Sequence, residues 1–285
     1  MKIMGQSVIT TTIRCIEHGT LSQKQDVLAV EEPLEISIDG RNISITMRTP
    51  GNDEELAAGF LFSEGILRDP GQVAEIAIVG ENRVNVALAS AAGVDLARLD
   101  RHFYTSSSCG VCGKTSIQAL ETAGCPVIPR DRPMLAPATI SQLPEKLRAS
   151  QQVFDSTGGL HAAGLFDSGG NLADVREDIG RHNAVDKLIG AQFLRGRLPL
   201  DSYVLMLSGR ASFELVQKAV MAGIGAVVAV GAPSSLAVDM AEQFGITLIG
   251  FARGERFNVY SGEFRLPLGE ATDRSTGDLA AVPHR

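Results

Sequence analysis

The amino-acid sequence predicts a mixed α/β protein whose two halves are built differently. Short strands of alternating polar and apolar residues dominate residues 1–135, whereas continuous apolar strands alternate with amphipathic helices over residues 136–262. Continuous apolar strands separated by helices are typical of a parallel sheet that helices cover. We therefore expect a β-rich N-terminal region, then an α/β domain with a mixed, largely parallel sheet. Residues 263–285 contain a polar stretch flanked by Gly269 and Gly277, so we expect a flexible C-terminal tail.

The composition is that of a globular protein and argues against several classes of function. Of the 285 residues, 44% are hydrophobic and 21% are charged, and the formal net charge is −7. A negative chain is a poor non-specific binder of nucleic acid. No apolar run approaches the roughly 20 residues of a membrane span, and the N-terminus lacks the apolar core of a signal peptide. Four cysteines at irregular spacing form no disulfide framework, so we expect a cytoplasmic protein without nucleic-acid or membrane partners.

The first half contains the patterns of two β-hairpins. Apolar residues alternate with polar ones over 34–47, interrupted by Asp39-Gly40, a pair that favours a tight turn. A second pair of strands is expected over 76–78 and 84–88. The region is therefore expected to be rich in antiparallel strands.

One helix is expected between these hairpins. Asn52 stands three residues before Glu55, which is the spacing of a capping box, and an apolar helical face follows it. Gly65 then ends the helical pattern. We expect a helix that Asn52 caps at its N-terminus.

The stretch from Ser106 to Lys114 is the strongest chemical signal in the first half. It contains Cys109 and Cys112, and apolar residues at helical spacing then predict a helix over about 114–123. Both cysteines are thus expected at or just before a helix N-terminus. The helix dipole and the charge of Lys114 would lower a thiol pKa below its usual value of about 8.5. The sequence therefore predicts a nucleophilic thiolate.

Several interpretations of this cysteine pair compete. A zinc site needs two further ligands at similar spacing, but Cys15 and Cys125 each stand alone, so we predict no metal site. A buried pair of thiols fits poorly in a loop of serines and glycines. A thioredoxin-like redox couple is expected near a βαβ pattern, which the preceding residues 98–102 do not show. We favour a thiolate that carries a group, with the redox couple as an alternative.

The second half shows a regular alternation of helices and strands. The order predicts a parallel sheet, and ligands of such sheets bind beyond the carboxyl ends of the strands. The expected helices cover residues 141–154, 183–194, 212–221 and 235–244, and the expected strands cover residues 160–166, 172–175, 203–207, 226–230 and 246–249.

Three segments follow the carboxyl ends of the expected parallel strands and combine small residues with arginines. Free backbone N–H groups at helix starts and arginine side chains both bind phosphate, so the segments are candidates for a phosphorylated ligand. Ordinary turns with surface arginines are the alternative, because neither G-x-G-x-x-G nor a Walker A motif is present. The segments are Ser208-Gly209-Arg210, residues 231–235, and Phe251-Ala252-Arg253-Gly254-Glu255-Arg256.

Two histidines are further candidates for acid–base chemistry. His182 lies in a polar cluster that spans Glu177 to Asn183, at the start of an expected helix. His161 stands alone at the beginning of an expected strand. We interpret the cluster as slightly more typical of function, and His161 as more typical of structure.

Four stretches, taken together and in this order, carry a resemblance to a known family. They are residues 49–61, the cysteine loop over 109–114, residues 177–187, and Ser208-Gly209-Arg210 with the helix that follows. On these motifs the chain resembles the FdhD family of formate dehydrogenase accessory sulfurtransferases. The likeness runs from about residue 25 to residue 262.

The resemblance implies a function, a cargo and partners. Members of the family are thought to accept sulfur as a persulfide from a cysteine desulfurase. They pass it to the molybdenum or tungsten bis-molybdopterin guanine dinucleotide cofactor before its insertion into formate dehydrogenase. By resemblance, Cys109 bears the persulfide, Cys112 is its partner, residues 251–256 contact the cofactor, and the protein is a homodimer. The first step has the logic of thiol–disulfide exchange.

The second half also resembles a cytidine-deaminase-type fold, which the family is understood to share, so we expect a three-layer α/β domain. Zinc deaminases need a glutamate two residues after a ligand histidine, and a Pro-Cys-x-x-Cys motif. Here Ala184 follows His182 at that distance, and Ser208-Gly209-Arg210 stands near the expected cysteines. Zinc-dependent deamination is therefore not expected. The remaining alternatives are a thiol oxidoreductase and a non-enzymatic chaperone for the cofactor.

Overall fold

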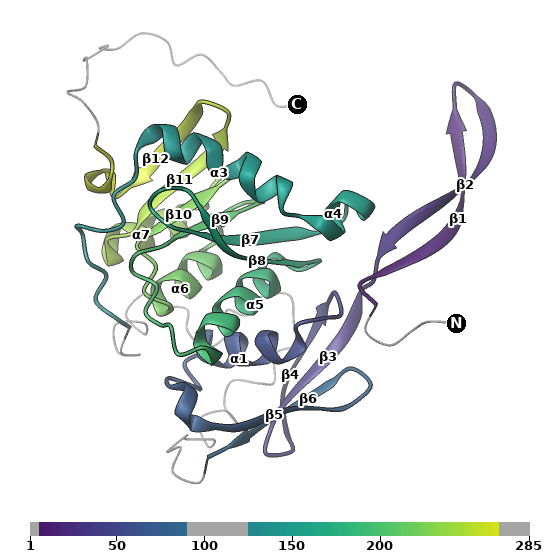
Figure 1. Cartoon of the computed structure of the whole chain (residues 1–285), viewed down its shortest axis with the longest axis horizontal. Coiled ribbons are helices and arrows are strands. Elements are labelled where there is room, and N and C mark those ends of the chain that lie inside the picture. The colour runs from purple at the N-terminus through teal and green to yellow at the C-terminus, as the bar shows by residue number, and fades with distance from the viewer. Residues whose placement is uncertain (1–5, 90–124, 268–285) are drawn as a thin grey trace.

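The structure, a computed structural model, describes residues 6–89 and 125–267 (Figure 1). It contains a six-stranded sheet, a four-stranded sheet and a separate two-stranded ribbon, together with helices that pack on the two larger sheets. The predicted mixed α/β architecture is confirmed. Cys109 and Cys112 lie outside the described residues, as does most of the predicted tail. No helix in the described ranges is long and apolar enough to cross a membrane.

The six-stranded sheet has a parallel centre and antiparallel edges. Strands β9, β10 and β11 are parallel to one another, while β7, β8 and β12 each run antiparallel to a neighbour. The order across the sheet is β12-β11-β10-β9-β7-β8. The strands are β7 (His161–Phe166), β8 (Leu172–Asp178), β9 (Val204–Leu207), β10 (Ala226–Ala229), β11 (Thr247–Arg253) and β12 (Arg256–Ser261).

Alternate residues of this sheet face two separate layers of helices (Figure 1). Leu205 and Val227 belong to the larger core beneath helices α5, α6 and α7, whereas Met206 and Val228 belong to a smaller core beneath α3. Because successive side chains of a strand point to opposite faces, continuous apolar strands serve both cores. The helices are α3 (Pro137–Ala149), α4 (Gln152–Thr157), α5 (Arg181–Leu194), α6 (Phe213–Met221) and α7 (Ser235–Phe244).

The four-stranded sheet packs against the same core through helix α1 (Asp53–Ser63), which lies between this sheet and α5 (Figure 1). Its order is β4-β3-β6-β5, and β3 is parallel to β6. Both predicted hairpins are present here. The strands are β3 (Glu32–Ile38), β4 (Arg41–Arg48), β5 (Val73–Gly80) and β6 (Arg83–Leu88), with short 3₁₀ turns at Pro70–Gln72 and Glu263–Arg265 elsewhere. The larger core contains residues from both halves, and the domain boundary near residue 135 stays a prediction.

Glycines allow the two halves to approach closely where α1 crosses α5. A Cβ atom placed on Gly59 would lie 1.8 Å from the carbonyl oxygen of Asp186, and one on Gly190 would lie 1.9 Å from that of Glu55. Any side chain at either position would therefore separate the helices. This crossing holds the N-terminal sheet against the α/β domain.

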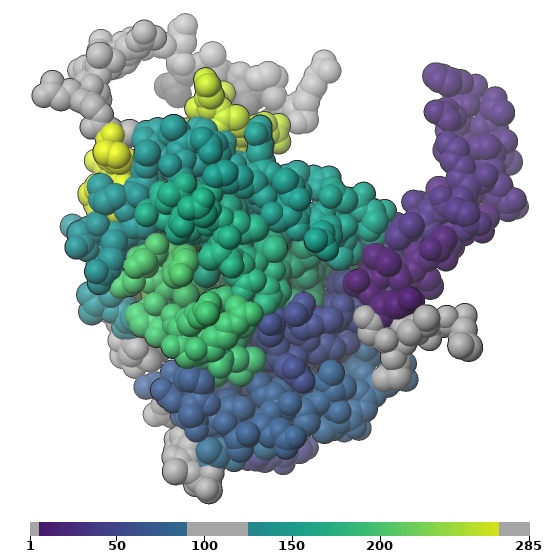
Figure 2. Space-filling view, in the orientation of Figure 1, coloured from purple at the N-terminus to yellow at the C-terminus, as the bar shows by residue number. Residues whose placement is uncertain are grey.

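The two-stranded ribbon of β1 (Val8–Glu17) and β2 (Thr20–Ala29) was not expected from the sequence. It projects from the body of the protein as the purple arm of Figure 2. Most of its side chains are exposed or half-buried, so it lacks the apolar face that marks a strand of a packed sheet.

Two local predictions are wrong. Asn52 adopts a left-handed conformation, with φ 57°, and its side chain makes no capping hydrogen bond within the described residues. The helix expected over 141–154 is instead two helices, α3 and α4, and Gln151 between them has the non-helical angles φ −86° and ψ 80°.

Candidate functional site

The carboxyl ends of β9, β10 and β11 and the beginning of β7 meet at one edge of the six-stranded sheet. Ser208 is tied to β7 there, because its backbone N–H donates to the Ala162 carbonyl at 3.0 Å and its Oγ accepts from the Ala162 N–H at 2.8 Å. His161 therefore lies beside Gly209, where a Cβ atom would lie 3.3 Å from the imidazole Nδ1. The edge is the place at which parallel sheets bind ligands.

A pocket of about 820 Å³ opens at this edge, and we call it the rim pocket. It lies on the face of the sheet that α3 covers, and α3, α4 and the end of β11 form its walls. The volume is in the range of pockets that enclose small molecules. Its lining includes Leu147, Gln151, Phe154, His161, Ser208 and Arg253.

The structure brings some of the predicted cofactor-binding residues into the rim pocket and leaves others beside it. The lining contains Ser208, Ala252, Arg253 and Gly254, whereas Gly209, Arg210, Phe251, Glu255 and Arg256 are not part of it. Residues 251–256 do not begin a helix. They form the end of β11 and the turn into β12, so Arg253 and Arg256 face each other as a cross-strand pair.

Phe251 has an unusual backbone conformation in this hairpin. Its φ is 54°, and its side chain is 46% exposed. The left-handed region is costly for a bulky residue, and such residues gather at functional sites. An irregularity in the β11–β12 register between Gly250 and Arg253 accommodates it.

His161 forms one side of the rim pocket, and its surroundings favour the neutral imidazole by lowering its pKa. Burial lowers the pKa of His161, and the charges of Arg181 and His182 lower it further, while Asp178 opposes them. Nε of Arg181 is itself buried and has no hydrogen-bond partner among the described residues. From the sequence alone, His161 is more typical of a structural residue. That interpretation is incomplete, because His161 lines the rim pocket.

His182 does not form a catalytic triad with the polar residues near it. Its Nε2 lies 2.7 Å from a carboxylate oxygen of Glu214 and 3.3 Å from Ser212 Oγ. A triad needs the acid and the hydroxyl on different ring nitrogens, and here both contact the same one. This contact instead joins the starts of α5 and α6.

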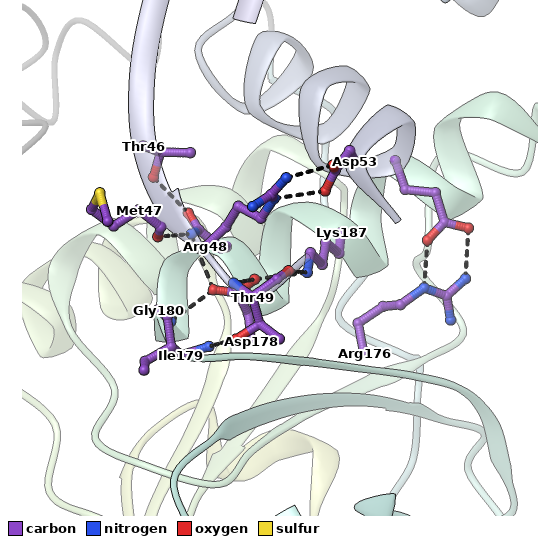
Figure 3. A network of polar contacts seen from close by, with 12 residues as sticks. Thr46, Met47, Arg48, Thr49, Asp53, Arg176, Asp178, Ile179, Gly180 and Lys187 are labelled. Carbon is purple, nitrogen blue, oxygen red and sulfur yellow. Dashed lines mark hydrogen bonds and ion pairs between the residues drawn. The ribbon is translucent and has the colours of Figure 1, made fainter. Parts of the chain in front are cut away.

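Much of the polar cluster over residues 177–183 holds the two halves together (Figure 3). Asp178 is fully buried, lies 2.7 Å from Lys187 Nζ and accepts from the backbone N–H of Thr49 at 3.1 Å. Lys187 also donates to the Thr49 carbonyl at 2.8 Å, and the Thr49 hydroxyl accepts from the Ile179 N–H at 3.2 Å. We call this set the inter-half clamp. Its members are Thr46, Met47, Thr49, Asp178, Ile179, Gly180, Asn183 and Lys187.

The amide of Asn183 completes the inter-half clamp. Its nitrogen donates to the Met47 carbonyl at 2.7 Å and to Asp178 at 3.1 Å, and its oxygen accepts from the Thr46 hydroxyl at 3.2 Å. Asp178 also accepts from the backbone N–H of Gly180 at 2.8 Å. Every polar contact of this amide is therefore structural.

The acidic first turn of α1 also pairs with arginines. Asp53 receives two hydrogen bonds from Arg48, at 2.9 and 2.8 Å (Figure 3). Glu55 receives two from Arg176, one of them at 2.8 Å. Such paired contacts fix the direction of both partners. They orient α1 against β4 and β8.

Sequence reasoning missed the wall of the rim pocket that α3 and α4 supply. Gln151 and Phe154 lie within a stretch that reads as one continuous helix, so no local signal marks them as site residues. The break depends on Glu177, whose carboxylate accepts from the backbone N–H groups of Val153 and Phe154 at 3.0 and 2.9 Å. That contact spans more than twenty residues of sequence.

Comparison with known proteins shows to which family the chain belongs. Residues 29–267 match the sequence profile of the FdhD/NarQ family. The chain belongs to the FdhD/NarQ family. The predicted resemblance is thereby confirmed, over nearly the span on which the motifs placed it.

Relatives match this FdhD/NarQ chain over nearly its whole length. The sulfur carrier protein FdhD of Streptomyces avermitilis is 51% identical, with 94% of this chain and 99% of the relative covered. That of Streptomyces coelicolor is 50% identical at the same coverage. A crystal structure from Desulfotalea psychrophila, provisionally named a formate dehydrogenase accessory protein, aligns with TM-score 0.73 and 28% identity. It covers 92% of this chain and 100% of its own, and it supports the fold.

Proposed function

We propose that this protein is a sulfur carrier that transfers persulfide sulfur from a cysteine desulfurase to a guanine dinucleotide form of the molybdenum or tungsten cofactor. Formate dehydrogenase is the enzyme that would receive the sulfurated cofactor. The family relationship and the names of the relatives support the carrier role. The rim pocket is the single structural observation that favours a nucleotide-bearing cargo, because it joins apolar walls to the exposed cation of Arg253.

The first step is an exchange at Cys109. Its thiolate attacks the outer sulfur of the desulfurase persulfide, a new S–S bond forms, and the desulfurase cysteine leaves as a thiolate. No oxidant or reductant is consumed, because one S–S bond replaces another. In the second step, the Cys112 thiolate attacks the inner sulfur of the Cys109 persulfide, the bond to the outer sulfur breaks, and that sulfur passes to the bound cofactor at the sulfide level. The Cys109–Cys112 disulfide that forms is then reduced to two thiols by a cellular thiol reductant.

The rim pocket would hold one nucleotide arm of the cofactor, which is the cargo of the protein. Ser208 and Arg253 line the pocket and supply a hydroxyl and a guanidinium for phosphate. Phe251, held in its left-handed conformation beside them, offers an exposed ring. In this proposal a homodimer provides two such pockets, one for each guanine dinucleotide arm.

Intact-protein mass spectrometry after incubation with a cysteine desulfurase and cysteine tests the carrier step. We expect the wild type to gain reductant-sensitive sulfur and Cys109→Ala to gain none. Cys15→Ala is the matched control and should load like the wild type, because Cys15 lies on the projecting arm.

Other outcomes would change the assignment. Loss of loading only in Cys112→Ala would move the persulfide to that residue. No added sulfur on the wild type, with an active desulfurase, would contradict the carrier mechanism and favour a cofactor chaperone. A stable intramolecular disulfide without persulfide would favour a thiol oxidoreductase.

A further inference from the structure

We propose that His161 is a ligand-contacting residue of the rim pocket, whose imidazole takes up a proton from solvent when a phosphate group binds beside it. The inference deepens the proposed function and rests on it, because it names a group that meets the anionic part of the cargo and makes binding depend on pH. It is carried by the place of His161 on the pocket wall and by the pairing of its neighbours.

The imidazole of His161 is reachable from the rim pocket. The residue is half-buried and belongs to the pocket lining. Neither of its ring nitrogens has a hydrogen-bond partner among the described residues. Polar side chains of a pocket that the fold leaves unpaired are the ones that can orient a ligand.

The second histidine near this edge of the sheet shows the structural alternative. Nε2 of His182 lies 2.7 Å from a carboxylate oxygen of Glu214 and 3.3 Å from Ser212 Oγ, and His182 is not part of the pocket lining. Its contacts are therefore used to join two helices. His161 has no comparable contact in the described parts of the chain, so its ring remains available to a ligand.

The turn after β9 places the imidazole of His161 beside a hydroxyl group. A Cβ atom on Gly209 would lie 3.3 Å from Nδ1 and 3.4 Å from Cε1 of the ring, so the glycine makes room for the imidazole next to Ser208. Ser208 Oγ accepts from the Ala162 N–H at 2.8 Å, which leaves its own hydroxyl proton for a ligand. A protonated imidazole and a hydroxyl are both donors, and phosphate oxygens are acceptors.

The surroundings of His161 favour the neutral imidazole in the free protein. Burial lowers the pKa of His161, and the charges of Arg181 and His182 on α5 lower it further, while Asp178 on β8 opposes them. A phosphate beside the ring acts in the other direction, because an adjacent anion stabilises the imidazolium and raises its pKa. The other charged residues that line the pocket are Glu145, Arg148, Asp155 and Arg253.

Binding and protonation are therefore linked. Between the lower pKa of His161 in the free protein and its higher pKa beside the anion, the protein takes up a proton as the phosphate binds. Affinity for a phosphate-bearing ligand consequently rises as the pH falls through this interval. Above the interval the imidazole stays neutral in both states, and the linkage disappears.

The test uses the full-length protein, GMP and the variant His161→Gln, because a glutamine amide donates a hydrogen bond but takes up no proton. Titration calorimetry in buffers of different ionisation enthalpy counts the protons taken up with each GMP. We expect more uptake by the wild type than by the variant at about pH 6.5. Between about pH 7.5 and 6, the affinity of the wild type should rise roughly threefold to tenfold more than that of the variant.

The phosphate of GMP also titrates, near about pH 6, but it does so with either protein, so the difference between the two proteins reports His161. His18→Gln is the matched control. His18 is exposed in the turn that joins β1 to β2 on the projecting arm. The same substitution there should leave both proton uptake and GMP affinity as in the wild type.

A second measurement needs no variant that folds stably. The imidazole signals of His161 in the wild type are followed with pH by NMR, with and without GMP. We expect the pKa of His161 to be higher when GMP is bound.

Three results would overturn the inference. The first is equal proton uptake by the wild type and His161→Gln when both bind GMP. The second is a pKa of His161 that GMP does not raise. The third is absence of GMP binding to the wild type, which would also remove the rim pocket from the proposed function, whereas persulfide loading of Cys109 tests the carrier step separately.

Discussion

Asp178 and Gln151 are both buried polar residues near the same edge of the six-stranded sheet, and they differ in what pairs with them. Asp178, in the inter-half clamp, contacts Lys187, Thr49, Gly180 and Asn183. Gln151, in the rim pocket, has an amide nitrogen without a partner in the described parts of the chain. The polar groups of the clamp are paired in the folded chain, whereas the amide nitrogen of Gln151 is buried without a partner among the described residues. Buried polar residues of one protein can therefore differ in role. The hydrogen-bond partners of each side chain show whether it already serves the fold.

The largest expected effect comes from breaking the clamp. Lys187→Met leaves the carboxylate of Asp178 buried without its cation, and both side chains are at most 2% exposed. Removing one partner of a buried pair typically costs about 3–5 kcal/mol of unfolding free energy, which urea denaturation would measure. The control is Lys24→Met, whose partner Glu17 is exposed. It should cost at most about 1 kcal/mol, and equal losses in both variants would contradict the clamp.

A smaller loss is expected from separating α1 and α5. Gly190→Ala places a methyl group on the carbonyl oxygen of Glu55, so the helices must move apart. Overpacking of this kind costs roughly 1–3 kcal/mol, sometimes more. Gly80→Ala is the control, because the nearest atom to its new methyl would be 3.7 Å away. A stable Gly190→Ala protein with unchanged urea midpoint would show that the two halves are not held by this crossing.

Arg253→Ala separates binding from stability at the pocket. Arg253 is exposed and lines the rim pocket, so its loss should weaken GMP binding by about tenfold and leave the melting temperature nearly unchanged. Arg256→Ala, on the facing strand of the same hairpin, should have a clearly smaller effect on calorimetric affinity. The reverse ranking would place the phosphate contact outside the rim pocket.

The smallest effect concerns pH. The folded protein lowers the pKa of His161 through burial and the charges of Arg181 and His182, against Asp178. Below about pH 6.5, the ordinary histidine pKa, the unfolded chain therefore binds more protons than the folded protein does. The stability that depends on neutral His161 is fully present above that pH and is lost as the pH falls. His161→Gln should reduce the drop in melting temperature between about pH 7 and 5.5. An unchanged pH profile would contradict the assigned shift.

The repeating part of the fold was predictable because local patterns and tertiary structure agree there. The runs that became β9 and β10 are continuously apolar, and the helices that follow them, α6 and α7, have helical periodicity. The ribbon of β1 and β2 was missed because its threonines and charges form no apolar face. Asn52 was expected to cap α1, but the chain turns there through a left-handed residue, which the capping pattern does not reveal.

The site was only partly predictable because its decisive contacts are distant in sequence. Ser208 and Arg253 follow strands and were found by the rule for parallel sheets, and both line the rim pocket. Asp178 and Thr49, 129 residues apart, pair across the two halves, so the cluster around Asp178 was interpreted as functional. Gln151 lines the rim pocket because the expected helix breaks beside it, and Glu177 caps the helix that follows the break.

Transfer of labelled sulfur tests the central claim most directly. The wild-type protein, loaded at Cys109 with isotopically labelled persulfide, is mixed with the guanine dinucleotide cofactor, and the label is followed on protein and cofactor. We predict that the label leaves the protein only when the cofactor is added, and that it appears on the cofactor. Label that remains on the protein, or that leaves equally fast without cofactor, would contradict the account.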